Sequence, residues 1–355
     1  MKIIKYIFFL LLLCIIAGSI YIGTKNGSFE VTEEQTFNAP DKLLYQSITD
    51  YTSLPKWNPF ESTEDQFTYS NDKSSATTGN WKDEDGTSYR LSTLQKIPFT
   101  KVKQRLQEPD KDSLYYDQLI WKLEREQDQQ TKVTLTVKGE LTFKEKLFQL
   151  LNNKELATDK GELIRRTFFK MEQHLDTLMN AYTINTTGIT EYGGGFYMYM
   201  ATASTIKAMP QKLSEMIPVV KNYITKNNIA QTGSSFTIFN DFNTQLGTTI
   251  FSAAIPVRDR VITPAESKVL CDFMPRQTVI KTILKGDYKY LTEAWDKTRQ
   301  FATERNLSVS ATLPAFEIYQ VSSSTESNPA EWITELYLPI EDSSDKPKAL
   351  IDTIR

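Results

Sequence analysis

The stretch "LTEAWDKTRQFATERNL" (residues 291–307) decides the fold of the second half of the chain, because it repeats an earlier one. The earlier copy, "LSEMIPVVKNYITKNNI" (213–229), aligns with it without a gap. In both copies the apolar residues recur at the three- and four-residue spacing of an amphipathic helix. A duplicated unit is therefore expected, and the sequence around each helix should repeat as well.

Strands surround both predicted helices in the same order. Upstream lie "FYMYMATAS" (196–204) and "TVIKTIL" (278–284), one before each helix. Downstream, "SFTIFNDF" (235–242) corresponds to "AFEIYQV" (315–321), and "IFSAAIPV" (250–257) corresponds to "ITELYLPI" (333–340). Each copy is predicted to be strand, helix, strand, strand. Two copies about a pseudo-twofold axis would form one antiparallel sheet with both helices on the same face.

Glu317 is the misfit in the apolar strand 315–321, because a carboxylate avoids the interior unless a partner is supplied. Alternation places Phe236, Ile238, Phe316 and Ile318 on one side of the sheet and Thr237, Phe239, Glu317 and Tyr319 on the other. If the helices cover the aliphatic side, the opposite side forms a groove. That groove is expected to hold Glu317, Tyr319, Glu335 and Tyr337, with Phe239 opposite and Tyr197 and Tyr199 at the rim.

A ring of tyrosines around a carboxylate offers hydroxyl donors and aromatic faces that suit a cation. The groove is therefore predicted to bind a small lipophilic or cationic ligand. The alternative is that Glu317 is a solvated carboxylate on an exposed sheet face.

Three motifs of this half resemble the GyrI-like effector-binding domain, which is also found attached to AraC-type and MerR-type regulators. They are "KGDYKYLTEAW" (285–295, with Gly286, Tyr288, Leu291 and Trp295), "PAFEIY" (314–319) and "TELYLPI" (334–340). The resemblance implies that Glu317 is the acidic residue at the centre of a ligand site. No helix-turn-helix and no basic recognition helix accompany it, so no nucleic acid partner is expected.

The first half begins with a strand, a short helix and the motif "WNPF" (57–60), within "FNAPDKLLYQSITDYTSLPKWNPF" (37–60). About a hundred residues of period-two alternation follow, and a helical pattern from Gly161 to Tyr182 closes the segment. This order, with Trp57, Asn58, Pro59 and Phe60, resembles the START-like (SRPBCC, polyketide-cyclase-like) helix-grip family. The resemblance implies a cavity between the closing helix and the sheet, and a plain filled core is the alternative.

Composition excludes several classes of function. The 355 residues carry 41 basic and 44 acidic side chains, so no basic excess attracts nucleic acid. One histidine, His174, and two cysteines, Cys14 and Cys271, cannot supply a clustered metal site or a nucleophile with its imidazole base. No metal, cofactor or catalytic residue is therefore expected, and Glu317 is the candidate if the protein is an enzyme.

The N-terminus carries an unbroken apolar run from Ile7 to Gly23, close to the length that crosses a bilayer as a helix. A cleaved signal peptide is the alternative, but the apolar character continues through Ile22, beyond the usual end of such a peptide. More positive charge precedes the apolar run, at Lys2, Lys5 and the amino terminus, than follows it, at Lys25. The positive-inside rule then predicts a single-pass protein with a cytoplasmic N-terminus and its domains outside the cytoplasm.

The sequence therefore predicts an α+β protein with four segments. They are a membrane anchor at 1–27 with a transmembrane helix at about 4–23, a helix-grip antiparallel sheet domain at 28–183, a duplicated β-α-β-β effector-binding domain at 184–342, and a flexible tail at 343–355. The predicted function is a membrane-anchored small-molecule binding protein, such as a sensor or a sequestering protein. The alternatives are a hydrolase with Glu317 as general base and a module that binds lipid or a protein partner.

Overall fold

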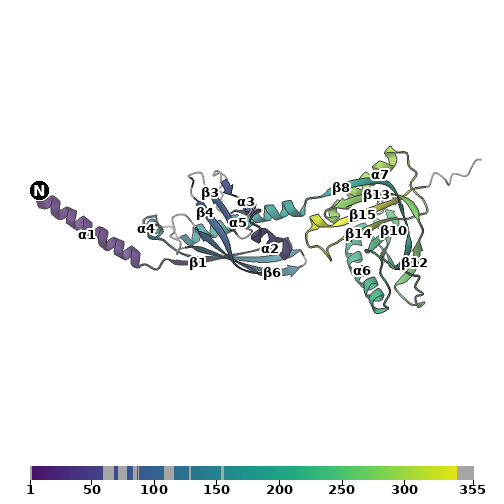
Figure 1. The fold of residues 1–355 in the computed structure, drawn as a ribbon, viewed down its shortest axis with the longest axis horizontal. Helices are drawn as coiled ribbons and strands as arrows, with labels where there is room; N and C mark the ends of the chain where they lie inside the picture. The colour runs from purple at the N-terminus through teal and green to yellow at the C-terminus, as the bar shows by residue number, and fades with distance from the viewer. Residues whose placement is uncertain are drawn as a thin grey trace, which may run out of the picture. The chain divides into compact units, whose positions relative to one another are not determined.

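The computed structural model describes residues 2–58, 68–70, 78–82, 86, 88–107, 116–127, 129–152 and 156–341. These residues form two compact units, Met1–Leu178 and Met179–Arg355 (Figure 1). The tail predicted at 343–355 lies outside the described residues, as do Pro59 and Phe60 of the "WNPF" motif. Both units combine helices with one antiparallel sheet, so the predicted α+β class is confirmed.

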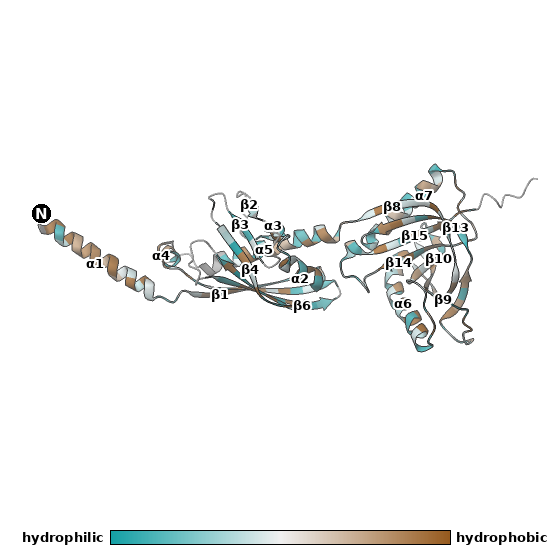
Figure 2. Ribbon diagram, viewed as in Figure 1, coloured by the Kyte–Doolittle hydropathy of each residue, from teal (hydrophilic) through white to brown (hydrophobic). Residues whose placement is uncertain are grey.

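The first unit begins with α1 (Lys2–Thr24), whose exposed side chains are apolar along its length (Figure 2). Its remaining elements are β1 (Ser28–Phe37), α2 (Asp41–Thr49), α3 (Leu54–Trp57), β2 (Thr68–Ser70), β3 (Thr78–Lys82), β4 (Ser88–Ile97), β5 (Lys101–Gln107), β6 (Asp117–Gln127), β7 (Gln130–Glu140), α4 (Phe143–Asn152) and α5 (Leu156–Met179). The strands form one antiparallel sheet in the order β1-β7-β6-β5-β4-β3-β2. This is the predicted meander closed by a long helix, an arrangement consistent with a helix-grip fold.

Aromatic side chains form the core of the first unit. Trp57 of α3 packs edge-on against Trp121 of β6, with ring centroids 5.9 Å apart, and Phe168 of α5 packs edge-on against Phe37 of β1. The buried amide of Gln104 accepts a hydrogen bond from the Trp121 indole and donates to the Ile48 carbonyl. The interior is thus packed with large rings, and the Gln104 amide bridges two polar groups among them.

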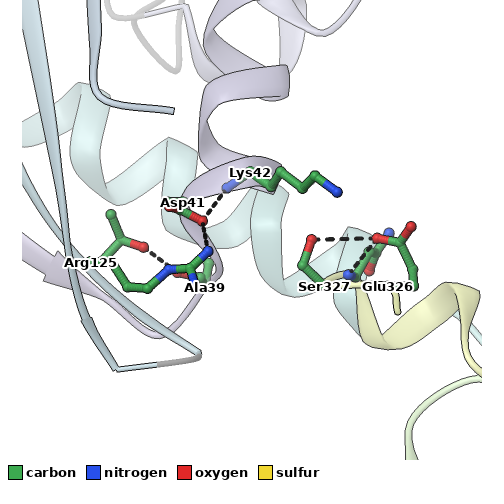
Figure 3. Close-up of polar contacts among 8 residues, drawn as sticks. Ala39, Asp41, Lys42, Arg125, Glu326 and Ser327 are labelled. Carbon is green, nitrogen blue, oxygen red and sulfur yellow. Dashed lines mark hydrogen bonds and ion pairs between the residues drawn. The ribbon is translucent and has the colours of Figure 1, made fainter. Parts of the chain in front are cut away.

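Asp41 is the first residue of α2. Its carboxylate accepts a hydrogen bond from the Lys42 backbone N–H at 2.8 Å and pairs with Arg125 of β6 at 2.9 Å (Figure 3). A negative charge in the first turn also complements the helix dipole.

The second unit contains the duplication. Its elements are β8 (Thr183–Tyr192), β9 (Gly195–Thr205), η1 (Ile206–Ala208), α6 (Met209–Lys226), β10 (Phe236–Asn243), β11 (Thr248–Pro256), β12 (Leu270–Met274), β13 (Gln277–Lys285), η2 (Tyr288–Tyr290), α7 (Leu291–Glu304), β14 (Ala315–Val321), η3 (Pro329–Glu331) and β15 (Ile333–Pro339). The sheet order is β12-β9-β11-β10-β14-β15-β13-β8. It reads symmetrically about the central pair β10–β14, so the predicted repeat of strand, helix, strand, strand is confirmed.

Two edge strands were not predicted, and they are exchanged between the copies. β8 precedes the first copy but pairs with β13 of the second, whereas β12 precedes the second copy but pairs with β9 of the first. The connections 193–194 and 275–276 must therefore run close together. Gly194 permits this approach, because it has a φ of +70° and a Cβ there would overlap the Met274 carbonyl oxygen.

Gly194→Ala is expected to lower the melting temperature of the protein, because the new methyl group meets backbone atoms and the residue needs a left-handed conformation. Gly193→Ala is the matched control, since nothing lies within 4 Å of its Cβ position and its φ is not positive. Thermal unfolding of both variants in detergent measures the difference. Equal melting temperatures would show that the two connections are not in contact.

Candidate functional site

Glu317 lies at the centre of β14, in the middle of the eight-stranded sheet. Its cross-strand neighbours are Thr237 of β10 and Leu336 of β15. The main contacts of α6 are with β9 and β11, and those of α7 are with β8, β13 and β15. The central pair β10–β14 therefore lies between the regions that the two helices cover, and Glu317 is on the same face as the helices.

The carboxylate of Glu317 is 2% exposed and is held by two neutral donors. The Trp295 indole N–H of α7 donates to one oxygen at 2.6 Å, and the Tyr319 hydroxyl donates to the other at 3.0 Å. The Tyr319 hydroxyl also lies 2.8 Å from that of Thr237. Among the described residues, Glu317 has no salt-bridge partner, so its negative charge has hydrogen bonds but no counter-charge.

Aromatic rings surround this carboxylate. The Tyr288 ring lies 5.7 Å from the Tyr319 ring and 4.7 Å from the Trp332 ring, and the Phe239 ring lies 6.0 Å from Trp295. Thr334, which pairs with Tyr319 across the strands, is buried, and its hydroxyl has no hydrogen-bond partner among the residues that the structure describes. We call Glu317, Trp295, Tyr319, Tyr288 and Thr334 the Glu317 cluster.

Burial sets the pKa values in the Glu317 cluster. It raises the pKa of Glu317, although the hydrogen bonds from Trp295 and Tyr319 oppose that shift. Burial and the neighbouring carboxylate also raise the pKa of Tyr319 well above its ordinary value and that of Tyr288 to about 12. Both phenols therefore stay neutral at physiological pH, and burial makes the negative charge of Glu317 costly.

The expectation that Glu317 and Glu335 line one groove is wrong. The cross-strand partner of Glu335 is Ile318, so its side chain emerges on the opposite face of the sheet. There Glu335 accepts hydrogen bonds from Lys281 at 2.8 Å, from the Tyr337 hydroxyl at 2.6 Å and from Gln320 at 3.2 Å. Burial alone would raise the pKa of Glu335, but these donors together lower it.

The predicted site residues separate into two groups. Glu317, Tyr319 and Phe239 share the helix face, as alternation predicts within each strand. Tyr197, Tyr199, Glu335 and Tyr337 belong to the opposite face, where Tyr197 and Tyr337 are buried in a cluster with Phe236 and Phe316. That face is an aromatic core, and the rings of Phe316 and Tyr337 stack at 4.8 Å.

The prediction of site residues did not include Trp295, Tyr288, Thr237 and Thr334. Tyr288 and Trp295 are seven residues apart, which is about two helical turns, so both can approach the same strand. That spacing is the sequence feature from which Tyr288 and Trp295 could have been predicted as neighbours of Glu317. Alternation already places Thr237 on the same side of the sheet as Glu317, whereas Thr334 gave no signal, because it joins the cluster only through strand register.

A hollow of about 370 Å³ lies near the Glu317 cluster. It is lined by residues 239–242 of β10, the segment 309–315, and Leu338 and Pro339 of β15. Phe239 lies between the hollow and the Glu317 cluster, because it lines the hollow and its ring packs edge-on against Trp295. The hollow has a mixed lining, with Asn240 and Asp241 beside apolar side chains, and the rings of Phe239 and Trp295 lie between it and the Glu317 carboxylate.

Two carboxylates with opposite pKa shifts give opposite pH dependences of stability. Glu317 has a raised pKa, so wild type should lose stability relative to Glu317→Gln as the pH rises above the ordinary carboxyl pKa of about 4.5. Glu335 has a lowered pKa, so wild type should be more stable than Glu335→Gln at neutral pH and lose that advantage on acidification. Thermal melts of the ligand-free protein from acidic to neutral pH check both signs, and parallel pH profiles for the two variants would contradict the assignment.

Comparison with protein families supports the fold of the second unit. Residues 195–341 match the family model described as "GyrI-like small molecule binding domain". The match includes α6, α7 and the whole Glu317 cluster. This part of the chain is therefore a GyrI-like domain, whose class is defined by binding of small molecules.

Several solved structures are similar to parts of the chain at low identity and low TM-score. The EcmrR C-terminal domain is 18% identical, with 45% of this chain and 98% of that chain covered and a TM-score of 0.38. A putative transcription regulation protein from Staphylococcus aureus is 10% identical over 46% of this chain and 99% of that one, with a TM-score of 0.31. The Aha1 dimer from Colwellia psychrerythraea is 13% identical over 41% and 94%, with a TM-score of 0.30. Comparison with curated proteins finds no match.

Proposed function

We propose that the second unit binds a lipophilic organic cation, whose positive charge pairs with Glu317. The observation that carries this proposal is a fully buried carboxylate with two neutral donors and no counter-charge among the described residues. Such a group is costly in the free protein and becomes favourable when a ligand supplies the cation. Lys281 already provides the counter-charge of Glu335, so Glu335 has no need of a ligand cation.

The aromatic residues of the cluster define the class of ligand. The rings of Trp295, Tyr288 and Tyr319 offer faces to a delocalised or quaternary cation, and burial strengthens that attraction. The hollow beside Phe239 has room for an apolar group, at about 370 Å³. We therefore propose an aromatic or alkyl cation whose body occupies the hollow and whose charge lies at Glu317.

The Glu317 side chain is buried, so a ligand can reach its carboxylate only if neighbouring side chains move. Trp295 and Phe239 separate the hollow from the carboxylate, and the Trp295 indole hydrogen bond occupies one oxygen of Glu317. A ligand entering from the hollow would displace these rings, and the cation would replace the indole donor. Titration of wild type and Glu317→Gln with matched cationic and neutral aromatic ligands tests the proposal.

We also propose that α1 anchors the protein in a membrane with the N-terminus in the cytoplasm. By length and composition α1 can cross a bilayer, as a signal sequence also can, and its side chains from Ile3 to Tyr21 are almost all exposed. The 23 residues of α1 span about 34 Å as a helix, against about 30 Å of hydrocarbon core. A binding domain held in this way would sense or sequester membrane-permeant cations near the bilayer surface.

The anchor is expected to keep the mature protein in the membrane fraction through an alkaline carbonate wash, because a spanning helix is not released by disrupting surface contacts. Recovery of a soluble form that begins near Ile20 would show a cleaved signal instead. A reporter fused after Arg355 should be active only outside the cytoplasm, and activity restricted to the cytoplasm would reverse the orientation.

A further inference from the structure

The short helix α4, "FKEKLFQLLN", exposes apolar side chains on one face. Phe143, Leu147, Leu150 and Leu151 follow the spacing of a single helical face. Of these, Phe143 is 46% exposed, Leu150 is 47% exposed and Leu151 is 73% exposed. A face of this kind on a ten-residue helix needs an apolar environment that the described part of the protein does not provide.

Direct contacts fix α4 to the residues where the chain leaves α1. The Leu141 backbone N–H donates to the Gly27 carbonyl at 2.8 Å, and the Lys146 ammonium donates to the Lys25 carbonyl at 2.7 Å. The approach is close at Gly27, because a Cβ there would overlap the Lys146 side chain. α4 also contacts α1 itself. It therefore stays beside the C-terminal end of α1.

The C-terminal end of α1 carries residues of the types that are common at the membrane–water interface. The Lys25 ammonium lies 4.9 Å from the centre of the Tyr21 ring, and tyrosine and lysine are the residues that position a helix end at the headgroups. α4 adds Lys144 and Lys146 to the same region. Its acidic residue, Glu145, accepts a hydrogen bond from the Thr142 backbone N–H at 2.7 Å and so caps the helix start.

We infer that α4 lies in the lipid interface of the membrane that α1 crosses, with Phe143, Leu150 and Leu151 in the acyl boundary and the lysines among the headgroups. This inference rests on the proposed role of α1 as a membrane span. The apolar face of α4 is expected to contact the bilayer, because α4 is held beside the residues where the chain leaves α1. It also combines an apolar face with basic side chains, as interfacial helices do. Two membrane contacts would then hold the first unit at a fixed height over the bilayer.

Depth-dependent quenching tests the inference on the full chain. The protein is reconstituted into phosphatidylcholine and phosphatidylglycerol vesicles, and an environment-sensitive fluorophore is attached to one cysteine at a time. The three positions are the natural Cys14 within α1, Leu151→Cys on the apolar face of α4, and Gln149→Cys on its other side, with the remaining cysteines replaced by alanine. Lipids brominated on their acyl chains then quench any fluorophore that reaches the hydrocarbon.

Quenching at Leu151→Cys should come within about twofold of that at Cys14, because an interfacial helix places its apolar face about 5–10 Å into the acyl boundary. Quenching at Gln149→Cys should be much weaker. If Cys14 is quenched and Leu151→Cys is not, the anchor stands and the inference about α4 is wrong. A Leu151 label shielded from water but not quenched by lipid would assign the face to a protein partner, which also overturns it. If Cys14 itself is not quenched, the anchor fails and the inference fails with it.

Discussion

Glu317→Gln is expected to weaken binding of a lipophilic aromatic cation at least tenfold, which corresponds to about 1.4 kcal/mol. The substitution keeps the shape of the side chain and leaves an acceptor for the Trp295 indole, but it removes the charge that pairs with the cation. A neutral ligand of the same shape should bind wild type and variant with similar affinity. Isothermal titration of the four combinations gives the difference directly.

Glu335→Gln is the matched control for that experiment, because it removes a carboxylate from the opposite face of the same sheet. Its effect on affinity for the cation should be small. Equal affinities of wild type and Glu317→Gln for the cation would contradict the proposal. If a reactive compound is found to turn over, and Glu317→Gln abolishes turnover while leaving affinity unchanged, Glu317 acts as a general base rather than as a counter-ion.

Trp57→Ala is expected to destabilise the first unit by about 3–5 kcal/mol, the usual cost of removing a large aromatic side chain from a core. Trp57 is fully buried, packs edge-on against Trp121 and donates its indole hydrogen bond to the Ser47 carbonyl at 3.0 Å. The substitution leaves a cavity and removes one of the hydrogen bonds that the Ser47 carbonyl accepts, while the Ser53 hydroxyl still donates to it. Scanning calorimetry of the full chain in detergent should show the transition of the first unit at a lower temperature.

Phe169→Ala is the control for Trp57→Ala, because the Phe169 ring of α5 is 61% exposed and its loss should change stability by less than about 0.5 kcal/mol. A loss below about 1 kcal/mol for Trp57→Ala would show that Trp57 is not part of a packed core. The helix-grip interpretation of the first unit would then lose its main support, since Trp57 belongs to the motif that predicted it.

The duplication made most of the second unit predictable from sequence. The helices 213–229 and 291–307 share an alignable pattern, and the strands beside them repeat in the same order, so the core of the sheet follows from local periodicity. The edge strands β8 and β12 did not follow, because each pairs with the other copy. An exchange of this kind depends on long-range pairing and leaves no periodic signal.

The candidate site was predictable only in part, for a related reason. Alternation fixes which residues share a face within one strand, so Glu317 and Tyr319 were placed together correctly. It does not fix how one strand pairs with the next, and a shift of one residue moves a side chain to the other face. Leu336, rather than Glu335, is the partner of Glu317, and this register separates the two carboxylates.

The helix face was also chosen incorrectly for β14. Leu336 and Leu338 of β15 do pack with Ala294 and Trp295 of α7, as expected for an aliphatic side under a helix. The same face contains Glu317, because Trp295 provides an indole donor that a purely aliphatic helix would lack. A polar residue under a helix can be predicted only when its partner on that helix is recognised.

The most direct test of the central claim is a crystal structure of the protein with a brominated aromatic cation, located by the anomalous signal of bromine. We expect the ligand to lie on the helix face, with its cationic nitrogen within about 4 Å of the Glu317 carboxylate and its apolar body in the hollow beside Phe239. A ligand bound on the opposite face, beside Glu335 and Tyr337, would contradict it.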